Sequence, residues 1–130
     1  MPAPSASRHP AGPPPRFGYH ATTLRAASLI QDGEGIDPEM SERFEHVFIF
    51  ETLEATLRYI NDYPANFADT GAVIFEINLA GLALTPDPQR PPLPGAWRTT
   101  ELIGRERLLG LIELVPYRYP PVISRRYALG

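Results

Sequence analysis

The chain of 130 residues contains no cysteine and no lysine. Without cysteine it can form no disulfide, no thiolate nucleophile and no thiolate zinc site, so the sequence leaves the redox compartment open. Without lysine it can form no Schiff base and no lysine–phosphate contact of the P-loop kind. All 12 basic residues are therefore arginines.

Long apolar runs and a strong positive charge are also missing. No segment approaches the roughly 18 to 20 apolar residues that a membrane span needs, and the N-terminus has no apolar signal-peptide core. We therefore expect a soluble, cytoplasmic protein without a membrane partner. The net charge of −3 has the wrong sign for a protein that neutralises many phosphates. Nucleic acid is thus not excluded as a partner, but it is not favoured.

Proline, in contrast, is abundant, with 16 residues. Six prolines fall within residues 1–16 among small residues, so this segment is predicted to be a disordered tail. The rest of the chain, residues 17–130, is predicted to form a single domain. Residues 85–96 hold five more prolines and are predicted to form a rigid loop.

Two short helices are predicted early in the domain. Thr22 or Thr23 can cap a helix that ends at residues 32–35. Thr52 can cap a second helix, which Pro64 closes. The apolar residues at helical spacing are Ala26, Leu29 and Ile30 in the first helix and Leu53, Leu57 and Ile60 in the second.

Strands account for most of the remaining pattern. The clearest is residues 72–79, in which apolar residues at 73, 75, 77 and 79 alternate with a second set on the other face. Further strands are predicted at residues 17–21, 46–50, 97–103 and 107–115. Because the helices come early and the strands late, the order favours an α+β fold over a doubly wound parallel sheet. No G-x-G-x-x-G turn is present, so a Rossmann dinucleotide site is not supported.

The segment Tyr19-His20-Ala21-Thr22 lies at the junction of the first predicted strand and the first helix. It resembles the His-Gly-Thr opening of ADP-ribosyltransferases, including the rifampicin-modifying enzymes and the RNA 2′-phosphotransferases, with Ala21 in place of the usual glycine. The segments 46–50, 54–59, 72–77 and 97–103 follow in the order of that family. The resemblance covers about residues 17–115 and implies split antiparallel β-sheets with two short helices early in the chain.

The resemblance implies that NAD is bound as a substrate. His20 would hydrogen-bond a ribose hydroxyl, and the backbone of Ala21 would hold the nicotinamide amide, with Tyr19 and Thr22 completing this edge. Phe48 or Phe50 takes the place of a family tyrosine that stacks on nicotinamide, and a phenyl ring can still stack on a flat ring. Tyr59 is a further candidate along the cofactor cleft. For each aromatic residue, plain packing in the core is the alternative.

Acidic and basic candidates follow from the same resemblance. Cleavage of the nicotinamide–ribose bond builds positive charge on the sugar, which a carboxylate stabilises. Glu101 is the first candidate for that role and Asp87 the second, although Glu101 can also be a solvated strand end and Asp87 an ordinary turn residue. Arg98 is the candidate for a pyrophosphate oxygen, with Arg25 as the alternative. No metal ligands are predicted.

The sequence therefore predicts an NAD-dependent mono-ADP-ribosyltransferase, a compact modifier or a toxin-like effector, whose acceptor is a small molecule, a protein or a nucleic acid. A catalytically silent binding module of the same fold is the alternative from another class. An RNA 2′-phosphotransferase is less favoured, because residues 17–130 are acidic. The remaining histidines are assigned no role: His9 lies in the tail and His46 begins a strand. The C-terminal arginines are interpreted as a solvated basic tail.

Overall fold

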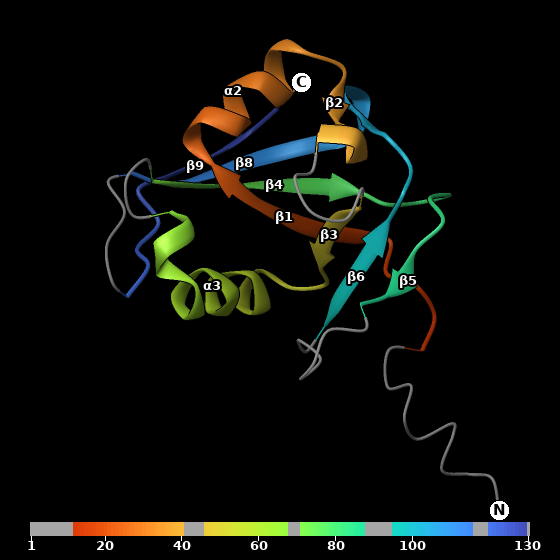
Figure 1. Ribbon diagram of the computed structural model, residues 1–130, viewed down its shortest axis with the longest axis horizontal. Coiled ribbons are helices and arrows are strands. Elements are labelled where there is room, and N and C mark those ends of the chain that lie inside the picture. Colours follow the sequence, from red (N-terminus) through yellow and green to blue (C-terminus); the bar gives the residue numbers. More distant parts are fainter. Residues whose placement is uncertain (1–11, 41–45, 68–70, 88–94, 116–119, 130) are drawn as a thin grey trace, which may run out of the picture.

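The computed structural model describes residues 12–40, 46–67, 71–87, 95–115 and 120–129 (Figure 1). Most of the predicted tail, residues 1–11, and most of the proline-rich loop, residues 88–94, lie outside these ranges. The helices and strands are β1 (Phe17–Thr23), α2 (Leu24–Asp32), β2 (Gly35–Ile36), β3 (Val47–Phe50), α3 (Leu53–Asp62), β4 (Ala72–Asn78), β5 (Thr85–Pro86), β6 (Ala96–Thr99), β7 (Ile103–Gly104), β8 (Leu108–Leu114) and β9 (Arg125–Ala128). Three single 3₁₀ turns complete the order, at Pro38–Met40, Pro64–Asn66 and Arg105–Arg107.

Seven of the strands form one sheet in the order β5-β6-β3-β1-β4-β8-β9, and β2 pairs with β7 in a separate two-stranded sheet. Every described pairing is antiparallel. The protein is therefore an α+β protein with an antiparallel sheet and two α-helices among the described residues, which confirms the predicted class.

The sheet is weakly joined at one position, between β1 and β3. All seven residues of β1 pair with β4, from Phe17 opposite Asn78 to Thr23 opposite Ala72. With β3, by contrast, β1 pairs at one position among the described residues, where Tyr19 lies opposite Phe50. Figure 1 shows β3 and β6 running at a steep angle to β4 and β8. A gap therefore opens between the C-terminal half of β1 and the start of β3.

The two helices cover opposite faces of the sheet (Figure 1). Under α2, Ala27 and Ile30 pack on a core built from alternate residues of β4 and their neighbours, including Val73 and Phe75. Under α3, Ile60 packs with the other set of β4 residues, Ala72 and Ile74. The alternation predicted for residues 72–79 is therefore confirmed, and β4 is covered on both faces.

Both helix starts follow the predicted capping chemistry. The Thr23 hydroxyl accepts a hydrogen bond from the Ala26 N–H at 3.1 Å, and the Thr52 hydroxyl accepts one from the Ala55 N–H at 3.0 Å. The buried face of α2 was predicted in part, since Ile30 packs on the core as expected but Ala26 and Leu29 do not. Ala27, not Ala26, is its buried residue, and the Leu29 side chain is 61% exposed.

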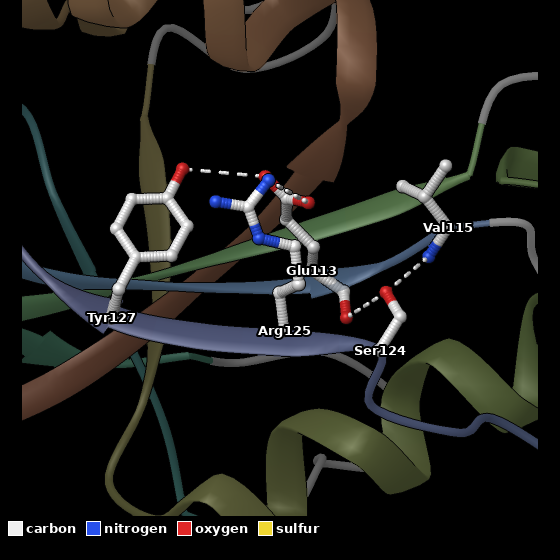
Figure 2. A network of polar contacts seen from close by, with 5 residues as sticks. All are labelled: Glu113, Val115, Ser124, Arg125 and Tyr127. Carbon is white, nitrogen blue, oxygen red and sulfur yellow. Dashed lines mark hydrogen bonds and ion pairs between the residues drawn. The ribbon is translucent and has the colours of Figure 1, made fainter.

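The C-terminal segment differs from the solvated tail that its arginines predict. Residues 125–128 form β9, which pairs with β8 at the edge of the sheet. Figure 2 shows the polar contacts that hold it: the Tyr127 hydroxyl donates to Glu113 Oε2 at 3.3 Å, and Arg125 lies 4.0 Å from Glu113 Oε1. The Ser124 hydroxyl donates to the Glu113 carbonyl at 2.9 Å. Partial burial of the Tyr127 hydroxyl raises its pKa, and the negative charge of the nearby Glu113 carboxylate raises this pKa further.

The segment predicted as one strand over residues 97–103 is instead two. Ala96–Thr99 form β6, and Ile103–Gly104 form β7, which leaves the main sheet to pair with β2. In the part of the chain that the structure describes, neither helix has the length and apolar character required to cross a bilayer.

Candidate functional site

A cavity of about 860 Å³ occupies the gap between β1 and β3. Its walls are residues 20–23 of β1, one side of α2, the turn at residues 33–37 that includes β2, and residues 46–48. A volume of this size is typical of a site for a small molecule or cofactor. The cavity exists because β3 leaves β1 after a single paired position, so no strand covers this side of residues 20–23 among the described residues.

His20 lies at the point where the two strands separate. It is half-buried, and its Nδ1 lies 2.8 Å from the carbonyl oxygen of Phe48. A carbonyl oxygen can only accept, so Nδ1 must carry the proton and donate it. Burial lowers the pKa of His20, and this outweighs the opposite effect of the Phe48 hydrogen bond. In the resulting neutral ring, Nε2 is a hydrogen-bond acceptor.

The lowered pKa of His20 has a consequence for stability. Below an ordinary histidine pKa of about 6.5, the unfolded chain binds a proton that the folded chain resists. The contribution of His20 to the free energy of unfolding is therefore complete above about pH 6.5 and is lost as the pH falls through that value. We expect the melting temperature to fall less between about pH 7 and pH 5 in His20→Gln than in the wild type. Equal losses in the two proteins would contradict the shift.

His46 and Phe48 form the β3 side of the cavity. Their ring centroids are 6.4 Å apart, as expected for residues two apart in an extended segment. The analysis of the sequence identified Phe48 but assigned His46 no role. The sequence did contain a signal for His46: it is two residues before Phe48, and this spacing in a strand places both rings on the same face.

Three charged residues line the cavity, and two of them were not predicted. Arg25, the alternative phosphate ligand, is on α2, whereas Glu34 and Asp37 flank β2. Asp37 Oδ1 accepts a hydrogen bond from the Glu39 N–H at 2.9 Å, which fixes the turn. No group of three or more potential metal-ligating side chains occurs within the described ranges. The lining thus carries one positively charged residue and two negatively charged ones.

Three predicted aromatic and strand residues lie elsewhere. Tyr19 and Tyr59 belong to the core under α3, and the Phe50 ring lies 5.2 Å from the Tyr59 ring. None of these three residues lines the cavity. Tyr19 lies outside the cavity because neighbouring residues of a strand point to opposite faces, so its side chain points away from that of His20. Phe50 lies outside it because β1 and β3 are still paired at that position. Of the two phenylalanines, only Phe48 meets the cavity.

The predicted acids and Arg98 also lie outside the cavity lining. The Glu101 carboxylate accepts a hydrogen bond from the Ala83 N–H, and the Glu101 N–H donates to Thr99 Oγ1 at 3.1 Å. Asp87 is buried after β5, where its N–H donates to the Ala96 carbonyl at 3.1 Å. Arg98 lies opposite Phe48 on β6, and its buried Nε has no hydrogen-bond partner among the residues that the structure describes. The predicted site residues that the fold brings together are His20, Ala21, Thr22 and Phe48, with Arg25, the alternative phosphate ligand.

The fold and the cavity together define an α+β protein with a ligand-sized site at a gap in an antiparallel sheet. The chain is similar in structure to EcPltA, with a TM-score of 0.63 and 11% sequence identity over 90% of this chain and 87% of that one. At this identity the similarity concerns the fold alone. No family model matches the sequence, and no curated protein matches it.

Proposed function

We propose that the protein is an NAD-dependent mono-ADP-ribosyltransferase with an ADP-ribosyltransferase-like fold, which transfers ADP-ribose from NAD to an acceptor. The observation that carries the proposal is the meeting of His20 and Phe48 in one cavity, with His20 Nε2 available as a neutral acceptor. These are two of the residues that the family resemblance assigns to NAD. The two residues are 28 positions apart in the sequence and lie on different strands.

Each part of NAD has a suitable neighbour in the cavity. A ribose hydroxyl would donate to His20 Nε2, and the nicotinamide ring would stack on Phe48. Ala21 and Thr22 lie on the stretch of β1 that has a paired strand on one side only among the described residues, so backbone groups on its other side suit the nicotinamide amide. Arg25 on α2 would pair with the diphosphate, the role that the sequence assigned first to Arg98.

Glu34 and Asp37 are among the residues that line this cavity, whereas Glu101 and Asp87 are not. As the nicotinamide–ribose bond breaks, positive charge develops on the sugar, and a nearby carboxylate lowers the energy of that state. We therefore transfer the acidic role from Glu101 and Asp87 to Glu34 or Asp37.

A nicotinamide-release assay tests the proposal. The purified protein is expected to release nicotinamide from NAD and to melt at a higher temperature in its presence. His20→Ala and Phe48→Ala are each expected to weaken NAD binding about 10-fold or more, since each loses one direct contact. Arg58→Gln, an exposed change on α3, is the control and should bind NAD as the wild type does.

The acid assignment is tested in the same assay. Glu34→Gln or Asp37→Asn should slow nicotinamide release, while Glu101→Gln should not. Slow release in Glu101→Gln together with normal release in both cavity variants would restore the first assignment.

A silent NAD-binding module is the second candidate, because the two acids that the family resemblance supplies lie outside the cavity. It predicts that NAD raises the melting temperature without any release of nicotinamide. If NAD has neither effect, both candidates are wrong.

A further inference from the structure

One wall of the cavity is formed by β2, which lies outside the main sheet. Among the described strands, β2 pairs only with β7, and each strand contributes two residues to the pairing. Next to this pairing, the carbonyl of the lining residue Glu34 accepts a hydrogen bond from the Arg105 N–H at 3.2 Å. The position of this wall therefore depends on the position of β7 and of the 3₁₀ turn that follows it.

Apolar packing holds the β2–β7 sheet against the rest of the protein but leaves its orientation open. Ile36 of β2 and Ile103 of β7 are both buried in the core under α2. Hydrophobic contacts have little directional preference. A sheet of two strands is also only marginally stable on its own. A directional contact near β7 would therefore fix an orientation that burial of the two isoleucines does not.

Arg107, the last residue of the turn after β7, makes such a contact. Its Nη1 donates to the Asn78 carbonyl at 3.1 Å and to the Ala80 carbonyl at 2.7 Å. Asn78 ends β4, and Ala80 lies in the turn after that strand. Hydrogen bonds from a charged donor are stronger than neutral ones, and a guanidinium stays protonated at any relevant pH. The half-buried Arg107 side chain thus joins the turn after β7 to the end of β4.

Arg107 itself does not line the cavity, so any effect on a ligand passes through the wall. The pairing of β8 with β4 begins one residue later, at Leu108. Arg107 therefore fixes the turn between that pairing and β7. The same turn contains the Arg105 N–H that binds the Glu34 carbonyl. A continuous set of hydrogen bonds and covalent links thus runs from the end of β4 to the cavity wall.

We propose that Arg107 is a positioning residue for the cavity, which holds the β2–β7 sheet in the orientation in which β2 and Glu34 form the wall. The inference rests on the proposed function for the identity of the ligand, NAD. Without the two hydrogen bonds of Arg107, the wall would adopt several orientations. Only a fraction of the molecules would then be ready to bind, and the apparent affinity would fall by that fraction.

The experiment compares the wild type with three variants. Arg107→Met keeps an unbranched apolar side chain but donates no hydrogen bond. Arg107→Lys keeps a positive charge and donors for the two carbonyls. Arg58→Gln, an exposed change on α3, is the control.

The first measurement is amide hydrogen exchange by NMR without any ligand. In Arg107→Met, the amides of residues 34–36 and 103–105 are expected to exchange about 10-fold faster, since the local opening that exposes them costs less. The amides of β4 and β8 are expected to exchange as in the wild type. Arg107→Lys should recover part of the protection, and Arg58→Gln should match the wild type.

The second measurement is the NAD dissociation constant. It is expected to be about 3-fold to 10-fold weaker in Arg107→Met, intermediate in Arg107→Lys and unchanged in Arg58→Gln. A purely structural role for Arg107 would speed exchange throughout β4 and β8 as well, and that result would overturn the proposal. Unchanged exchange at residues 34–36 and 103–105, or faster exchange there with an unchanged dissociation constant, would also overturn it.

The two measurements separate this inference from the proposed function. If the wild type does not bind NAD, the proposed function is wrong. The exchange of residues 34–36 and 103–105, measured without ligand, then still decides whether Arg107 positions the cavity wall.

Discussion

Alanine at position 35 is expected to destabilise the protein by about 2 to 5 kcal/mol, through backbone strain and overpacking together. Gly35 has a φ of +122°, in a region that L side chains rarely adopt. A Cβ atom there would collide with the backbone carbonyl of Ile103 and would lie 3.0 Å from the N atom of Arg105. The variant can relieve this contact only by separating β2 from β7, where Gly35 pairs with Gly104.

Gly81→Ala is the matched control for Gly35→Ala. Gly81 also has a positive φ, +84°, but the nearest atom to its Cβ would be the Arg107 side chain at 3.9 Å. Its cost should therefore be the backbone strain alone, about 1 kcal/mol. Urea unfolding of the three proteins measures the difference. Equal destabilisation of the two variants would contradict the close β2–β7 contact. Because Gly35 also lines the cavity, its variant should lose NAD binding as well.

Truncation of Phe75 to alanine is expected to cost about 3 to 5 kcal/mol of unfolding free energy. The Phe75 side chain is fully buried on β4, between His20 of β1 and Leu111 of β8 in the sheet register. No described strand or helix can close the space without moving the central strands, so the variant keeps a cavity under α2. Phe75→Leu, which retains most of the volume, should cost less than about 1.5 kcal/mol.

Phe17→Ala provides the same change at an exposed position. Phe17 begins β1 and is 54% exposed, and its ring lies 5.8 Å from the Arg16 guanidinium carbon. Its removal should cost about 1 kcal/mol or less. Thermal or urea unfolding of the wild type and the three phenylalanine variants measures the loss of stability in each. A cost for Phe17→Ala as large as that for Phe75→Ala would be inconsistent with the position of the core.

Local features of the fold were predictable from the sequence because their causes are local. Thr52 caps α3 through a hydroxyl that reaches three residues along the chain, and the alternation of residues 72–79 assigns each side chain to one face. The two-residue strands β2 and β7 carry no periodicity, and they depend on pairings between residues 67 to 69 positions apart in the sequence, Ile36 with Ile103 and Gly35 with Gly104. The strand β9 was not predicted for a similar reason. Its arginines have the charge pattern of a solvated tail, and their partners Glu113 and Glu76 come close only in the folded protein.

The candidate site was predictable in part. His20 and its neighbours are contiguous in the sequence, so one motif identified them together. Phe48 and Phe50 have the same type and parity in one strand, and only the divergence of β3 from β1 determines which of them meets the cavity. Glu34 and Asp37 carry no motif. They reach the site because the chain after α2 turns back through β2, a pairing that the sequence does not reveal.

The single paired position between β1 and β3 also has a mechanical consequence. Across most of this sheet, force is shared by ladders of several hydrogen-bonded pairs, but along this line Tyr19 and Phe50 form the one pair of the ladder among the described residues. Shear stiffness is lowest there, so the β5-β6-β3 portion can pivot against the β1-β4-β8-β9 portion at the least energetic cost. The hydrogen bond from His20 to the Phe48 carbonyl is a second tie across that line. A ligand that contacts both His20 and Phe48 would bridge the two portions of the sheet and reduce their motion relative to each other.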